Sequence, residues 1–252
     1  MNLSRKQFLA TAALGMAGAA VTSAQTTSLA SSTPKSSDCA PAPQPGLHFH
    51  ILRPDEYDHA AMMQTAQASH PHKQVFVTSS LEEIRPGLAS LYLHMQNSLN
   101  AFQFSMSGGP GSLGTLGVLM GPAVLLALND AMWGKYPFGP SLKLHEANGM
   151  PALRNVYYHA TSKLDPKASA DDAAGMYQDW SAQAVLARGG KFWVCHNALT
   201  GASHQFAGKM KLNPDEVLAE WKKNFLPGYQ WIPAGVGGAQ LAQDNGWKLF
   251  VV

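Results

Sequence analysis

The chain has 252 residues, of which 46% are hydrophobic and only 13% are charged. This length fits one large domain or two small ones and is ample for a hydrophobic core. The charged share is about half of the roughly 25% that is usual, which excludes a highly charged disordered chain. The net charge of +2 is too small, and the basic residues are too scattered, for a nucleic-acid-binding surface.

The first residues have the pattern of an export signal. A basic pair, Arg5 and Lys6, precedes an uncharged run rich in Ala and Gly, and small residues follow up to Ala24. This pattern is typical of a signal peptide, so residues 1–24 are predicted to be removed. The residues around the basic pair are also similar to a bacterial twin-arginine signal, with Lys6 in place of the second arginine. We therefore expect a periplasmic or otherwise exported protein, by the twin-arginine or the general secretory route.

Residues 25–72 are predicted to be a flexible tether. Residues 25–46 are almost entirely Thr, Ser, Ala, Pro, Gln and Gly, a composition that buries too little apolar surface to offset the entropy of ordering. The following stretch is polar and rich in histidine, with the pairs His48/His50 and His70/His72. Neither pair has a third ligand at a spacing known from zinc sites, so we predict no metal and no cofactor. A metal site assembled in space from His145, His159, His196 or His204 with Cys195 is the alternative that the sequence leaves open.

Residues 73–252 are predicted to form a single α/β domain. Short apolar runs that resemble strands alternate with stretches of helical spacing. The predicted strands are 74–78, 116–120, 191–195, 230–233 and 247–252. The predicted helices begin near Pro86, Ala123, Ala173, Asn213 and Val236. Such alternation favours a mostly parallel sheet of about five strands with helices on both faces. No later stretch reaches the ~18 apolar residues of a membrane span. Residues 134–170 interrupt this alternation of strands and helices with Gly, Pro, Asn and His. We interpret them as an insertion, and one interpretation of its role is that it covers the site.

The candidate site follows from the ends of the predicted strands. Ligands of parallel sheets gather beyond the carboxyl ends of the strands, and Cys195 lies at one of these ends. The backbone N–H groups of a following helical turn would favour its thiolate form, which is the nucleophilic form. The alternative is a small unreactive side chain packed inside the sheet, and spacing alone favours it. The predicted ligand-pocket residues at the same edge are Gly121, Pro122, Asn197, Pro233 and Gly235.

His196 and Asn197 each have two interpretations. On an extended strand His196 would point to the opposite face from Cys195, whereas on a turn its ring would reach the sulfur and stabilise a thiolate. Both remain open, and we include His196 with Cys195 as a candidate catalytic residue. Asn197 is favoured as a cap of the turn.

Several segments together resemble the DsrE/DsrF-like sulfur-relay family. They are residues 117–124, 192–199, 225–228, 232–236 and 243–248. The resemblance covers roughly residues 73–252, and the export signal and the 134–170 insertion depart from the small cytoplasmic members. It implies a flavodoxin-like fold, homo-oligomers, and a cysteine, here Cys195, that carries sulfur as a persulfide. The implied function is a sulfur carrier or sulfurtransferase, whose partner is a small sulfur species or a relay protein.

Two further possibilities remain open from the sequence. The first is a non-catalytic module of the same fold, whose strand-end pocket binds a small ligand or a metal. The second is a redox pair of Cys39 and Cys195, because an oxidising compartment and a long tether permit the two thiols to meet.

Overall fold

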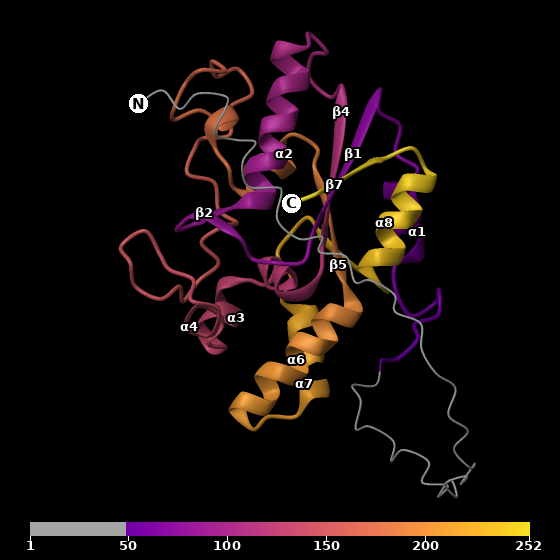
Figure 1. Cartoon of the computed structure of the whole chain (residues 1–252), viewed down its shortest axis with the longest axis vertical. Helices are drawn as coiled ribbons and strands as arrows, with labels where there is room; N and C mark the ends of the chain where they lie inside the picture. Colours follow the sequence, from indigo (N-terminus) through magenta and orange to yellow (C-terminus); the bar gives the residue numbers. More distant parts are fainter. Residues whose placement is uncertain (1–48) are drawn as a thin grey trace, which may run out of the picture. The chain divides into compact units, whose positions relative to one another are not determined.

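Five strands form one all-parallel sheet in the computed structural model, which describes residues 49–252 (Figure 1). The strands are β1 (His72–Thr78), β4 (Leu113–Leu119), β5 (Lys191–Cys195), β6 (Tyr229–Ile232) and β7 (Lys248–Val251). Their order in the sheet is β6-β5-β4-β1-β7. The predicted flavodoxin-like α/β fold is confirmed, with a strand order that differs from that of flavodoxin itself because the last strand lies beside the first.

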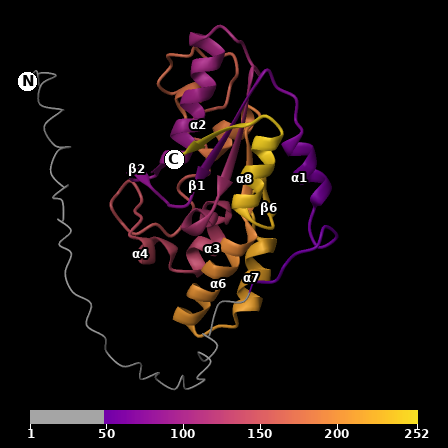
Figure 2. The same ribbon diagram turned by 45° about the vertical axis from the view of Figure 1, so that its right-hand side comes forward.

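The direction of the crossovers explains which helices cover which face. The steps from β1 to β4, β5 and β6 all run the same way across the sheet, so right-handed connections place their helices on one face. The step from β6 to β7 runs back across the sheet and places α8 (Gly235–Asp244) on the opposite face, beside α1 (His59–Ala66). Figures 1 and 2 show α1 and α8 next to each other.

The remaining helices lie on the face of the sheet opposite α1 and α8 or beyond the ends of its strands. They are α2 (Ser90–Asn100), α3 (Asp130–Lys135), α4 (Phe138–Leu142), α5 (Ala182–Ala187), α6 (His196–Met210) and α7 (Pro214–Lys223). A π-helical turn, η1 (Ala101–Ser105), continues α2, and two 3₁₀ segments are η2 (Gly121–Ala127) and η3 (Met176–Gln178). A small antiparallel sheet of β2 (Glu83–Arg85) and β3 (Leu88–Ala89) precedes α2.

Two hydrophobic cores lie on the two faces of the sheet. Alternate residues of β5 serve both, since Phe192 and Val194 belong to the larger core and Trp193 to the smaller one. The smaller core also contains Met62 of α1 and Ala239 of α8. A strand that is buried on both faces must be apolar throughout, which is why these strands appear in the sequence as uninterrupted apolar runs.

Local chemistry accounts for two of the predicted helix ends. At α7, the Asn213 side chain accepts a hydrogen bond from the N–H of Asp215, and Pro214 takes the first turn, where its missing N–H costs nothing. At the end of α5, Gly189 has φ of +88°, a conformation that a residue with a side chain rarely adopts.

The structure corrects three of the expected elements. The flexible tether is wrong for residues 59–66, because they form α1 and bury Met62 and Ala66. The helix expected from Ala173 is shorter, with η3 and α5 as separate segments, and the helix expected from Ala123 is divided into η2 and α3. The export signal and the first part of the tether lie outside the described residues. None of the helices in residues 49–252 has the length and apolar content that spanning a bilayer requires.

Candidate functional site

Cys195 lies at the carboxyl edge of the sheet, where β5 ends and α6 begins. Its neighbour on one side is Ile232, the last residue of β6, and Val194 before it pairs with Leu119 of β4. Cys195 is the N-cap of α6, and its Sγ accepts a hydrogen bond from the N–H of Ala198 at 3.4 Å. The thiol thus replaces the hydroxyl or carboxylate that caps most helices, and the cap is Cys195 rather than the predicted Asn197.

The Cys195 side chain is closely surrounded and only 7% of its surface is exposed. Gly235, the first residue of α8, lies against it, since a Cβ added to Gly235 would be 3.1 Å from Cys195 Cβ and 2.8 Å from Met120 Sδ. Gly235 is therefore needed for close contact between α8 and this edge, which explains its place among the predicted residues. Pro233 lies in the same β6–α8 connection.

The His196 ring lies against Trp231 and does not pair with the sulfur. The ring centroids of His196 and Trp231 are 5.3 Å apart, and His196 is 4% exposed. Burial, reinforced by the positive charge of Lys222, lowers the pKa of His196 to about 4. The imidazole is thus neutral near pH 7, so it supplies no positive charge to a thiolate, and its buried Nδ1 has no hydrogen-bond partner among residues 49–252.

An apolar cavity of about 350 Å³ lies beside the first turns of α6. Three of the predicted ligand-pocket residues line it, namely Gly121, Pro122 and Asn197. Ala198, whose N–H donates to Cys195, lines it too, whereas Cys195, Pro233 and Gly235 do not. The predicted site residues therefore lie at one edge of the sheet, but in two groups. One group surrounds the buried thiol of Cys195, and the other lines the adjacent cavity.

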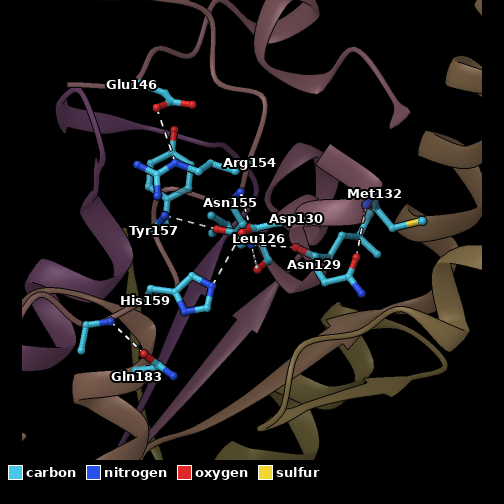
Figure 3. Close-up of polar contacts among 12 residues, drawn as sticks. Leu126, Asn129, Asp130, Met132, Glu146, Arg154, Asn155, Tyr157, His159 and Gln183 are labelled. Atoms are coloured by element: carbon cyan, nitrogen blue, oxygen red, sulfur yellow. Dashed lines mark hydrogen bonds and ion pairs between the residues drawn. The ribbon is translucent and has the colours of Figure 1, made fainter. Parts of the chain in front are cut away.

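The connection between β4 and β5 contains the expected insertion, and a buried asparagine anchors it. Residues 143–175 contain no helix or strand. The amide nitrogen of Asn155 donates to the carbonyl oxygens of Leu126 and Leu128, both at 2.8 Å, and Asn155 N–H donates to Asp130 (Figure 3). Leu142 of α4 is the part of residues 134–170 that lines the apolar cavity. Asn155 therefore holds the connection in place, Arg154 is exposed, and neither residue lines this cavity.

The remaining histidines do not assemble a metal site in the part of the chain described. Among residues 49–252, no three His, Cys, Asp or Glu side chains are close enough together to hold a metal ion. His50 pairs with Glu56 at 2.6 Å and His159 with Asp130 at 3.8 Å (Figure 3). His48 and Cys39 lie outside the described residues.

Sequence reasoning missed the partners that define this site. Met120 and Trp231 contact Gly235 and His196 from two other strand ends, and only the strand order brings them there. The capping role of Cys195 had a local signal, because Cys195 stands directly between the apolar run of β5 and the start of α6, which is the position of an N-cap residue.

No protein-family model, curated protein or solved structure matches this chain.

Proposed function

We propose that this protein is an exported, DsrE-like sulfur carrier in which Cys195 holds a sulfane sulfur as a persulfide. The observation that supports the proposal best is the hydrogen bond from the Ala198 N–H to Cys195 Sγ at the start of α6. A backbone N–H at a helix N-terminus stabilises negative charge, and both a thiolate and a persulfide anion carry it. The same edge of a parallel sheet is where ligands are usually bound.

The proposed reaction needs no cofactor and no external oxidant. With thiosulfate as donor, the Cys195 thiolate attacks the outer sulfur, the S–S bond of thiosulfate breaks, and sulfite leaves with the electron pair. The product is the Cys195 persulfide anion. An acceptor thiolate then attacks the outer sulfur of the persulfide, takes it, and restores the Cys195 thiolate.

The packing around Cys195 restricts the donors. A side chain that is only 7% exposed is reached by a small inorganic species more easily than by a second protein. The adjacent 350 Å³ cavity offers a space for such a donor, and movement of the first turn of α6, which contributes Asn197 and Ala198 to its wall, would join this space to the thiol. The proposal therefore favours thiosulfate or polysulfide as donor, and onward transfer to a periplasmic relay partner or a second copy of the chain would require the same movement to expose the persulfide.

The test is the mass of the intact, folded protein after exposure to thiosulfate or polysulfide. The variant Cys39→Ser leaves Cys195 as the single thiol, and we expect it to gain one sulfur atom that a reductant removes. The matched variant Cys195→Ser retains Cys39 and a hydroxyl cap, and we expect no gain at the site. If Cys39→Ser gains no sulfur, and its thiol reacts with small alkylating agents only after denaturation, the sulfur-carrier proposal is wrong.

A second candidate function is a non-catalytic binding module for a small apolar ligand. It is supported by the cavity beside α6, which Gly121, Pro122, Leu125 and Phe206 line without Cys195. Native mass spectrometry of protein purified from its own cell distinguishes the two functions. A stoichiometric organic ligand that is retained in Cys195→Ser supports the binding module.

A further inference from the structure

Arg188 lines a second cavity, which lies at the opposite end of β5 from Cys195. It directly follows α5, and β5 begins three residues later, whereas Cys195 ends that strand. The cavity has a volume of about 500 Å³. Its other lining residues include Gln103, Gly109, Gly111, Ser112 and Tyr177.

Three side-chain amides from one helical segment hold the Arg188 guanidinium. Nη1 donates to Gln96 Oε1 at 3.1 Å and to Asn100 Oδ1 at 2.6 Å, and Nη2 donates to Gln103 Oε1 at 2.9 Å. Residues 96, 100 and 103 are spaced along one face of α2 and η1, so their side chains reach the same partner.

Hydrogen bonds from the amide nitrogens of Gln96 and Asn100 to backbone carbonyls fix the orientation of these two side chains. The Gln96 amide nitrogen donates to the Met176 carbonyl at 2.7 Å, and that of Asn100 donates to the Tyr177 carbonyl at 2.8 Å. Their oxygens must therefore face Arg188. The guanidinium also lies 4.9 Å from the centroid of the Tyr177 ring, which restricts it further. Arg188 is thus held in place before any ligand arrives, which reduces the entropy cost of binding.

The charge of Arg188 has no counter-ion within residues 49–252. All three acceptors are neutral amides, and Arg188 forms no ion pair with a carboxylate of the described residues. Burial lowers the pKa of Arg188 to about 10, so the group is still a cation at neutral pH. A guanidinium has five N–H donors, and the described residues accept from three of them. A partly buried cation with spare donors is stabilised by an anion that accepts from them.

We propose that the cavity at Arg188 binds an oxyanion group, namely a carboxylate, phosphate or sulfate. The two remaining N–H donors of Arg188 would contact its oxygens. Gly109 and Gly111, both with φ of +76°, form part of the wall without side chains that would fill the space. This site is independent of the proposed persulfide chemistry, since it lies at the amino end of β5 and uses no residue of the Cys195 edge.

The test is stabilisation of the full-length protein by oxyanions at constant ionic strength. Sodium phosphate, sulfate and acetate are each titrated against chloride while the melting temperature is followed, and the three arms distinguish the classes of oxyanion. We expect a saturable rise for at least one of them in the wild type. Arg188→Lys keeps the charge but loses the fork of donors, so its apparent affinity should fall by about tenfold or more.

Arg154→Lys is the matched control, because Arg154 is exposed and paired with Glu146, and it should respond as the wild type does. The NMR signal of the Arg188 Nε–H group in the wild-type protein gives a second readout. It is assigned by its absence from the spectrum of Arg188→Lys, and it follows binding in the wild-type protein itself. An oxyanion site at Arg188 is excluded if this signal does not move over the titration, or if Arg188→Lys is stabilised as strongly as the wild type.

Discussion

His196 is a buried imidazole whose environment opposes its protonation. Its ring lies against Trp231, and the Lys222 ammonium lies 4.2 Å from the centroid of the same tryptophan. A proton on His196 would place a second positive charge near Lys222 with little water to solvate it. Glu56 and His50 act in opposite senses on this group and are weaker influences than burial. The folded protein therefore keeps His196 neutral.

This neutrality predicts a loss of stability in mild acid. The pKa of His196 is lowered to about 4 in the folded state and is about 6.5 in an unfolded chain. Between these values the unfolded state binds a proton that the folded state does not. The free energy of unfolding should thus fall as the pH drops from about 6.5 through about 4, by up to about 3 kcal/mol. Urea denaturation at several pH values measures this slope.

The variant His196→Gln removes the titrating group and should flatten the slope over this pH range. An unaltered slope in His196→Gln would show that another group causes the acid sensitivity.

At the scale of elements, the long connection from β4 to β5 depends on a few buried polar contacts. Asn155 is 1% exposed and ties the connection to the end of η2 through two carbonyl groups (Figure 3). Tyr157 donates to Glu83 in β2 at 2.7 Å, and Tyr158 donates to the Pro227 carbonyl. A segment without helices or strands has few backbone hydrogen bonds of its own, so these side chains replace them.

Asn155→Ala should destabilise the protein by roughly 2–4 kcal/mol, because it leaves the Leu126 and Leu128 carbonyls buried without a donor. Amide hydrogen exchange should rise first within residues 143–175. Arg154→Ala removes only an exposed ion pair and should cost less than about 1 kcal/mol. Equal effects of the two substitutions in chemical denaturation would contradict the anchoring role of Asn155.

The elements that the sequence predicts well are those with strong local signals. The strand around Phe192 is a continuous apolar run, and α7 has its cap, proline and charged ends in sequence order. The small β2–β3 sheet forms across a turn at Pro86 and Gly87, where a helix start was predicted instead, and α2 begins only at Ser90. The helix α1 has a weak local signal and packs through contacts that are distant in sequence, such as the Trp247 Nε1–H bond to the Ala66 carbonyl. Periodicity cannot reveal such contacts.

The same distinction applies to the candidate site. The position of Cys195 at a strand end follows from the apolar run before it and is confirmed. Its packing against Gly235 and the separation of the cavity from the thiol depend on how α8 returns across the sheet. The direction of the His196 ring depends on Trp231 of β6, which is 35 residues further along the chain. The sequence therefore predicts the edge on which the site lies but not its geometry.

At the scale of the whole molecule, residues 49–252 form a compact unit with cores on both faces of the sheet. A chain that begins at Leu47 should therefore fold, with one cooperative unfolding transition at the melting temperature of the full-length chain. A chain that begins at Ala68 lacks α1 and exposes the sheet face that Met62 covers, so it should melt at a lower temperature. Loss of cooperative unfolding in the longer variant would show that residues 1–46 are needed for folding.

The place of β7 has a consequence for synthesis of the protein. β1 pairs with β4 on one side and with β7 on the other, and β7 follows the other four strands of this sheet in the chain. Until residues 248–251 emerge from the ribosome, the nascent chain presents the backbone donors and acceptors of β1 along an open edge. An open edge is a template for pairing with another chain. Premature termination before Lys248 would therefore produce a species prone to aggregation, even though all residues of the Cys195 edge had already been made.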